Sequence, residues 1–341
     1  VTPTSITTPI PTEVPTVESP VSQQLANGTK QTPTPMATPT LIATASTVFI
    51  PHGFGPGIYY RHPFLDSPSA LLMNLDTISL TSINVQAYDI MPEAVVYAVD
   101  DKLVLVAPDG NVNMINVPGL HQMDRPSFSP DGTKVAVQAR ETYTDPEDLN
   151  IYVVDLNTGK AERISHLDVN EESPEWFANE NKIAYTSFDP TRELIAHIYD
   201  MDIGKEIQAI KEAGYIHLAV SDDGTLMFNP ILARLYDVNT GKVVGDLKDK
   251  VLTALENNGY TLDTRFRGQA NLGTFPIDAD FSPDGNHIVF DGAVEKNGKF
   301  GLIIFSMTTT GDNITPLTEI IEVNPAFSNN NNYSQLNPNW R

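Results

Sequence analysis

Short apolar segments separated by turn residues run through the chain from about residue 48 onward. Segments such as KVAVQA (134–139) and KIAYTS (182–187) are rich in β-branched and aromatic residues, with Gly, Asn, Asp or Pro close to their ends. This pattern predicts short β-strands joined by tight turns. One stretch differs, because Val251, Leu252 and Leu255 form an apolar stripe at helical spacing within KDKVLTALEN. We therefore predict a short helix at 248–257 inside an otherwise all-β domain.

One phrase recurs along the chain at the period of β-propeller blades. Its clearest copies are RPSFSPDGTKVAVQA (125–139) and DADFSPDGNHIVFDG (278–292), and its weaker copies are SPEWFANENKIAYTS (173–187) and HLAVSDDGTLMFN (217–229). The aligned positions are Phe128, Trp176, Val220 and Phe281, at spacings of 48, 44 and 61 residues. One blade per spacing fits, with an insertion in the last.

The repeated phrase carries the chemistry of a β-turn. The Pro of SPDG presets φ, the Asp carboxylate accepts hydrogen bonds from turn amides, and the Gly supplies the positive φ that reverses the chain. A second hairpin signal, of the type D-x-[DN]-x-G, follows at 155–159, 200–204 and 237–241. Two hairpins make one four-stranded blade.

The SPDG turns, the Pro-x-aromatic before them and the D-x-N-T-G hairpins together resemble the TolB-like β-propeller repeat. The resemblance covers roughly residues 50–341. It implies a fold and little chemistry, since this family occurs in periplasmic translocation proteins, sugar-active enzymes and the propeller halves of serine peptidases. It also implies a docking role, because TolB-like propellers commonly serve as docking platforms.

We predict an all-β, six-bladed propeller at 48–341, and seven blades is the alternative. The segments assigned to the six blades are 58–83, 84–117, 123–165, 172–210, 216–246 and 277–317. Residues 247–276 do not fit the repeat and form an insertion. The C-terminal segment 337–340 again has the Pro-x-aromatic pattern, and we expect it to return beside 57–61 and complete blade one. Such a closure removes the exposed sheet edges of a linear stack.

The composition changes abruptly near residue 47. Residues 1–47 hold thirteen Thr and eight Pro but three charged residues, so alone they cannot bury enough apolar surface to fold. We predict an extended arm or stalk. Its end, LIATASTVFI (41–50), lacks Pro and Gly and is β-branched, which predicts a strand that pairs with a sheet edge. The residues expected to bind a partner are Leu41, Ile42, Thr44, Val48, Phe49 and Ile50.

The charge balance and the absence of cysteine exclude several functions. With 21 basic and 43 acidic side chains, the net charge of −22 repels nucleic acids and anionic membrane surfaces. No apolar run approaches the roughly 18 residues of a membrane span. Because the sequence holds no cysteine, it has no disulfides, thiolate metal sites or cysteine nucleophiles, and we expect no lipid anchor on an N-terminal Cys. Because the chain begins at Val1, we expect a processed product that is secreted or on the cell surface.

No catalytic or metal-binding motif emerges, and we expect no enzyme activity, metal or cofactor. HGFGPG (52–57) resembles an oxyanion-hole glycine motif of prolyl-peptidase hydrolases, but no G-x-S-x-G elbow accompanies it. The seven histidines lack metal-ligand spacing, so we expect each to pack or hydrogen-bond alone. Adjacent carboxylates, such as Glu171 and Glu172, are expected at turns. The expected ligand face is Arg265 and Arg267 in the insertion, and the alternative is a solvated loop whose arginines pair with carboxylates.

Two functions fit these observations. In the first, the protein is a non-enzymatic structural subunit whose arm adds as a strand to a neighbouring propeller and builds a head-to-tail extracellular filament. In the second, the propeller is a cell-surface or periplasmic binding module on a flexible stalk, with a protein, peptide or glycan as its ligand. Contacts of 41–50 with another chain favour the first, and an arm folded on its own propeller favours the second. We predict the first, with the chain itself as its partner.

Overall fold

The computed structural model separates residues 1–44 from a second unit, Ala45–Arg341. The residues that the structure describes all belong to the second unit: 58–63, 70–74, 77–83, 87–99, 101–143, 149–167, 169–188, 194–211, 213, 218–262, 278–322 and 338–340. The arm predicted at 1–47 and the segment 41–50 lie outside these residues, as does HGFGPG at 52–57.

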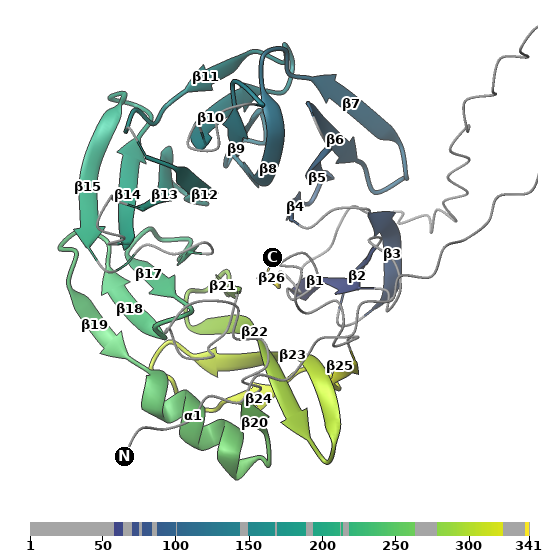
Figure 1. The fold of residues 1–341 in the computed structure, drawn as a ribbon, viewed down its shortest axis with the longest axis vertical. Coiled ribbons are helices and arrows are strands. Elements are labelled where there is room, and N and C mark those ends of the chain that lie inside the picture. Colours follow the sequence, from purple (N-terminus) through teal and green to yellow (C-terminus); the bar gives the residue numbers. More distant parts are fainter. Residues whose placement is uncertain are drawn as a thin grey trace, which may run out of the picture. The chain divides into compact units, whose positions relative to one another are not determined.

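The described residues form six antiparallel sheets, which follow one another in chain order around a common centre (Figure 1). The first sheet contains β1 (Ile58–Pro63), β2 (Ala70–Asn74), β3 (Thr77–Ile83) and β26 (Asn339–Trp340). The second contains β4 (Tyr88–Met91), β5 (Ala94–Val99), β6 (Lys102–Val106) and β7 (Val112–Asn116). The third contains β8 (His121–Phe128), β9 (Lys134–Arg140), β10 (Leu149–Asp155) and β11 (Ala161–Arg163).

The remaining sheets continue the series. The fourth contains β12 (Glu171–Trp176), β13 (Lys182–Phe188), β14 (Leu194–Asp200) and β15 (Lys205–Lys211). The fifth contains β16 (Ala219–Val220), β17 (Leu226–Asn229), β18 (Arg234–Asp237) and β19 (Val243–Asp246). The sixth contains β20 (Thr261–Leu262), β21 (Ala279–Phe281), β22 (His287–Lys296), β23 (Lys299–Thr308), β24 (Thr315–Pro316) and β25 (Ile321–Glu322). The all-β propeller prediction is confirmed, and five sheets have the four-stranded form.

The sixth sheet departs from the predicted form of four strands built from two hairpins. Its two long strands, β22 and β23, have ten residues each, so each has room for two short partners. β22 pairs with β21 at one end and with β20 at the other, and β23 pairs with β24 and β25 in the same way. β20 comes from the predicted insertion at 247–276, so part of that insertion belongs to the sheet.

The SPDG phrase builds the turn that its residue types predict. Asp131 Oδ1 accepts hydrogen bonds from Ser129 Oγ at 2.7 Å and from the backbone N–H of Thr133 at 3.0 Å. Gly132, with φ of 65°, closes the turn by donating to the Ser129 carbonyl at 2.9 Å. The same network recurs around Asp223 and Asp284. These bonds stabilise the ionised carboxylate and lower the pKa of Asp131 and Asp223, and that of Asp284 to about 2.

The D-x-N-T-G hairpins also join neighbouring sheets. Asp155 Oδ1 accepts from the Thr158 N–H at 2.8 Å, and Gly159, with φ of 68°, donates to the Asp155 carbonyl. A Cβ on Gly159 would lie 2.5 Å from the carbonyl oxygen of Asn116 on β7 of the preceding sheet. The turn therefore needs glycine both for its conformation and for the close approach of two sheets.

The inner strands of neighbouring sheets are linked by hydrogen bonds that backbone N–H groups donate to side-chain oxygens. Asp89 Oδ2 on β4 accepts from the Phe128 N–H at 2.7 Å, and Ser127 Oγ on β8 accepts from the Trp176 N–H at 2.8 Å. Asp280 on β21 accepts from the Trp340 N–H at 2.7 Å, and Trp340 belongs to β26, which pairs with β1. In each case the acceptor precedes an inner-strand apolar residue, so the repeated phrase also specifies how one sheet docks on the next.

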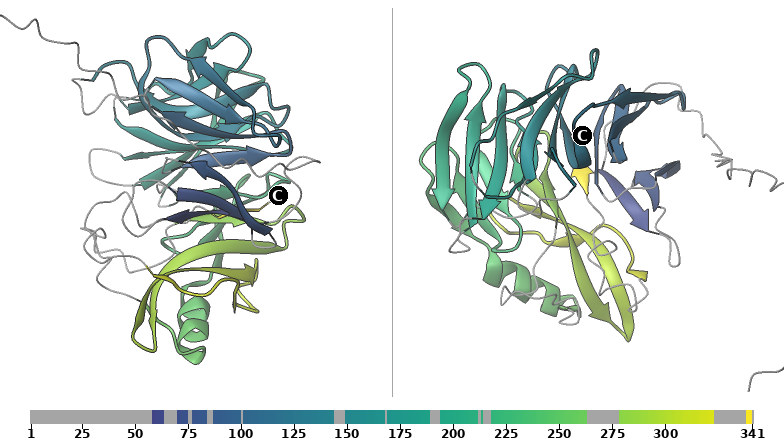
Figure 2. Two further views of the ribbon diagram at one scale, coloured as in Figure 1. Left: turned by 90° about the vertical axis from the view of Figure 1, so that its right-hand side faces the viewer. Right: turned by 45° about the horizontal axis from the view of Figure 1, so that its top comes forward.

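The helix α1 (Lys248–Asn257) has the bounds that the apolar stripe predicts. Val251 and Leu255 are buried and Leu252 is partly buried, and they pack with Phe290 and Phe305 of the sixth sheet. Figures 1 and 2 place α1 beyond the strands of this sheet, next to β20. The helix thus covers the outer part of one sheet.

Candidate functional site

The side chains predicted to bind partners do not fall in the described part of the chain. Leu41, Ile42, Thr44, Val48, Phe49 and Ile50 of the arm lie outside it, and so do Arg265 and Arg267 of the insertion. Four other places in the described residues carry polar or apolar groups that could bind or react: a charge cluster on the inner strands, a partly buried Ser-His-Glu row, a cleft beside α1 and the outer strand edges.

The inner strands bring charged residues of three sheets together. Arg125 of β8 acts electrostatically on Glu172 of β12 and on Asp278, which precedes β21. Burial raises the pKa of Glu172, and it raises that of Asp278 to about 7, while the Arg125 charge opposes both shifts. Glu172 and its neighbour Glu171 were expected at a turn, but they begin β12. The acidic side chains already face a cation here, so the cluster serves the packing of the inner strands.

A row of three polar side chains crosses the fourth sheet, with Ser187 and His197 buried and Glu206 exposed on the outer strand. Ser187 Oγ on β13 lies 2.7 Å from His197 Nε2 on β14, and His197 Nδ1 lies 2.8 Å from Glu206 Oε2 on β15. The expectation that each histidine stands alone is therefore wrong for His197. The three residues fall on consecutive strands whose register places them on one face, and that register belongs to the folded sheet and cannot be read from residue spacing.

The order of these contacts matches that of a Ser-His-acid triad, but the surroundings do not suit catalysis. Ser187 is 1% exposed and His197 is 4% exposed, so a substrate cannot reach the hydroxyl. The neighbouring Glu171 is fully buried, its Oε2 has no hydrogen-bond partner among the described residues, and burial raises its pKa to about 7. The row satisfies buried polar groups between the third and fourth sheets, where Tyr185 packs with Ile151 and Ile164.

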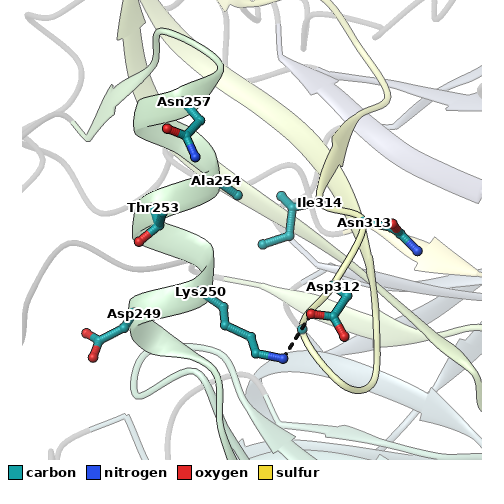
Figure 3. Close-up of a pocket in the computed structure, with 9 residues that line it drawn as sticks. Asp249, Lys250, Thr253, Ala254, Asn257, Asp312, Asn313 and Ile314 are labelled. Carbon is teal, nitrogen blue, oxygen red and sulfur yellow. Dashed lines mark hydrogen bonds and ion pairs between the residues drawn. The ribbon is translucent and has the colours of Figure 1, made fainter.

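A cleft of about 580 Å³ lies between α1 and the turn after β23 (Figure 3). Lys250 Nζ bridges its two walls by donating to the Thr310 carbonyl at 2.7 Å and to Asp312 Oδ1 at 2.9 Å. The other lining residues are Asp249, Thr253, Ala254, Asn257, Gly311, Asn313 and Ile314. Because the lysine is already paired and the other groups are carboxylates, amides and a hydroxyl, the cleft suits a neutral polar ligand better than an anion.

The outer strands carry exposed apolar side chains. Each of β7, β11, β15 and β19 pairs with a single neighbour in the described part of the chain, so one edge of each is open. The large apolar residues exposed on them are Val112 and Met114 on β7, Ile207 on β15, and Val243 and Val244 on β19. Unpaired backbone groups beside apolar side chains are what an added strand uses.

Solved structures of TolB proteins superpose on this chain. TolB from Acinetobacter baumannii has a TM-score of 0.54 at 19% identity, over 77% of this chain and 63% of that one. The chain folds as a TolB-like β-propeller. A TolB candidate from Agrobacterium tumefaciens has a TM-score of 0.51 at 12% identity, over 84% of this chain and 99% of that one. The resemblance stated from the SPDG turns is thereby confirmed.

Other comparisons add no function to the propeller. No protein-family model and no curated protein matches the chain. Hydrazine synthase from Kuenenia stuttgartiensis superposes with a TM-score of 0.46 at 14% identity, over 68% of this chain and 65% of that one, which is too weak a likeness to imply a shared activity.

The described residues lack two further features. They contain no helix with the length and apolarity needed to cross a membrane. They also contain no group of three or more His, Asp or Glu side chains placed to hold a metal ion.

Proposed function

We propose that this protein is a non-enzymatic, secreted structural subunit that forms an extracellular filament. In the proposed assembly, residues 41–50 of one chain add as a β-strand to the propeller of the next chain. We further propose that the six sheets are the six blades of the propeller, with β20 and β25 as additions to the sixth.

The observation that supports this function best is the pair of apolar side chains on the open edge of β7. Val112 is 55% exposed and Met114 is 62% exposed, next to backbone groups without a strand partner in the described chain. Charged side chains on an edge strand hinder the addition of another strand. This chain has 43 acidic residues, yet β7 contains no charged residue. An interface that needs an uncharged edge explains why charge is absent there.

The arm supplies a complementary strand. LIATASTVFI has no charge, Pro or Gly, so all its backbone groups can pair and its side chains can alternate between two faces. Because donor segment and acceptor edge are different surfaces of one chain, the contact is heterologous, and identical subunits continue it into a filament unless the rotation closes a ring.

Electron microscopy of the native protein beside a chain that starts at Phe49 tests this function. We expect filaments from the full chain and single particles from the shorter one, because the shorter chain lacks most of the donor strand. A second variant, Ala43→Pro with Thr47→Pro, keeps the arm but removes two of its backbone donors, and it should also stop assembly. Filaments that persist in either variant, or a full chain that stays monomeric at high concentration, would reject the function.

The cleft beside α1 supports a second function, in which the propeller is a surface binding module. Its amide, hydroxyl and carboxylate groups could hydrogen-bond to the hydroxyls of a glycan, and Lys250 holds the two walls together. A glycan array separates the functions. Specific binding that Asn257→Ala weakens would favour the module, whereas the filament function requires no ligand in this cleft.

A further inference from the structure

We infer that β7 is the strand edge that accepts residues 41–50 of a second copy of this chain. The inference rests on the proposed function and assigns the acceptor within it.

The other outer strands are protected against strand addition, and β7 is not. β15 has Lys at both ends and Glu206 between them, β11 has three residues of which two are charged, and β19 ends in Asp246. The pairings of β15, β19 and β3 with their neighbours also contain register shifts. Charge, shortness and irregularity are the usual devices that block an edge. β7 (VNMIN) has no charged residue, and its pairing with β6 runs without a shift.

The pattern of backbone hydrogen bonds shows which groups of β7 face outward. Val117 N–H donates to the Asp101 carbonyl, and Ala107 N–H donates to the Asn111 carbonyl. If the register of β6 and β7 is continued by one residue at each end, Asp101 lies opposite Val117 and Ala107 lies opposite Asn111. In an antiparallel ladder every second opposed pair is hydrogen-bonded. Asn113 and Ile115 therefore bond to β6, whereas Val112, Met114 and Asn116 direct their N–H and C=O groups to the open edge.

The neighbouring sheet limits the accessible edge to two residues. Gly159 of the turn before β11 approaches the Asn116 carbonyl so closely that a Cβ there would lie 2.5 Å from it. Val112 and Met114 remain, each with one outward N–H and one outward C=O. Their side chains share a face with Val104 and Val106, the buried residues opposite them on β6. An added apolar strand would extend this face outward.

The occupant is identified by charge and sequence. A chain with net charge −22 repels a copy of itself, so a contact between copies is favoured where both surfaces are uncharged. Both VNMIN and LIATASTVFI carry no ionisable side chain. Val48, Phe49 and Ile50 also give the segment apolar side chains of the size needed to cover Val112 and Met114.

A proline scan of β7 tests the assignment in the full-length chain. Met114→Pro removes an N–H that points outward, so the ladder with β6 stays intact and the propeller should melt within a few degrees of the wild type. We expect at least a tenfold rise in the concentration needed to form filaments. Asn113→Pro is the matched control, because it removes a bond to β6 and should lower the melting temperature more. If Met114→Pro assembles like the wild type, β7 is not the acceptor.

Two lysine substitutions, made in separate variants, give the same test without proline. Met114→Lys places a cation on the proposed edge, and Val244→Lys places one on β19, where Val244 is 58% exposed. We expect the first to suppress filaments and the second to leave them unchanged. Suppression by Val244→Lys alone would move the acceptor to β19 and overturn the inference.

Cysteine crosslinking shows whether the segment 41–50 that binds β7 belongs to a second copy or to the same chain. The sequence has no cysteine, so a chain with Met114→Cys can be mixed with chains carrying one cysteine each at positions 43 to 48. We expect a disulfide-linked heterodimer at alternate positions, and none when Val244→Cys replaces Met114→Cys. If bonds form only when both cysteines are in one chain, the arm folds back on its own propeller. That result overturns both the β7 assignment and the proposed filament function. If filaments form but no disulfide to Met114→Cys is found, only the assignment of β7 as the acceptor is overturned.

Discussion

A glycine in the turn motifs of this propeller can have two roles: it adopts the positive φ of the turn, and it allows a neighbouring sheet to approach closely. Gly159 and Gly285 share a φ of 68°, which L-residues with a side chain rarely adopt. A Cβ on Gly159 would strike the Asn116 carbonyl at 2.5 Å, whereas one on Gly285 would meet nothing within 4 Å. The two positions therefore separate the energetic effect of the turn from that of the contact between sheets.

Replacing each glycine with alanine should give unequal losses of stability. We expect Gly285→Ala to lower the free energy of unfolding by about 1 kcal/mol, from the left-handed backbone alone. Gly159→Ala should lower it by about 2 to 4 kcal/mol, because the sheets must also move apart. Urea denaturation followed by tryptophan fluorescence measures both. Equal losses would mean that the contact with Asn116 relaxes freely.

At the scale of elements, the hydrogen bonds between inner strands matter more than their number suggests. Asp89 is 5% exposed and accepts from the Ile90 and Phe128 backbones, both at 2.7 Å. Removing the carboxylate leaves the buried Phe128 N–H on the next sheet without this acceptor, which destabilises the folded state. The Asp89 carboxylate therefore adds a directional link to the apolar contacts between the second and third sheets.

We expect Asp89→Ala to lower the free energy of unfolding by about 2 to 4 kcal/mol. Asp109→Ala is the control, since Asp109 accepts the Asn111 N–H at 2.9 Å on the exposed surface, and it should lower stability by less than about 1 kcal/mol. Thermal unfolding by circular dichroism compares the two. A mild loss in Asp89→Ala would show that water replaces the carboxylate between the sheets.

The elements also show what the sequence could and could not predict. The SPDG and D-x-N-T-G turns and the helix α1 were predictable, because Gly, Asp and Pro encode local backbone geometry and an apolar stripe encodes a helix face. The extra strands β20 and β25 were not, because pairing with the long β22 and β23 depends on distant residues. The row of Ser187, His197 and Glu206 was missed for the same reason, since strand register brings the three together.

For the whole molecule, a rise in pH has opposite effects on the stability contributed by buried carboxyls and by exposed turn carboxyls. Burial raises the pKa of Glu171 and of Asp278 to about 7, so the folded state holds protons that the unfolded chain releases above about pH 4. Their contribution is present below that pH and is lost as pH rises toward 7. Asp284, with its pKa lowered to about 2, contributes stability above about pH 4 that is lost as pH falls toward 2.

We therefore expect the melting temperature to peak between about pH 4 and 5 and to fall toward pH 7.5. The net charge of −22 acts in the same direction, because self-repulsion grows as carboxyls ionise. In Glu171→Gln the loss of unfolding free energy between pH 5 and 7.5 should shrink by about 2 kcal/mol, because most of the contribution of a pKa raised from 4.5 to about 7 is lost across that range. Differential scanning calorimetry across this range tests it, and an unchanged slope in Glu171→Gln would mean that water reaches Glu171.

The pairing of β26 with β1 joins residues that are nearly the whole propeller apart in sequence. A ribosome delivers β1 first and β26 last, so the first sheet waits for its inner strand while the other sheets can already pair locally. Such a late, long-range step is slow, and it leaves β1 and its backbone groups exposed in the meantime. Biogenesis of this protein should therefore be sensitive to chaperone supply, and changes at Trp340 should reduce the yield of folded protein more than they disturb the finished ring.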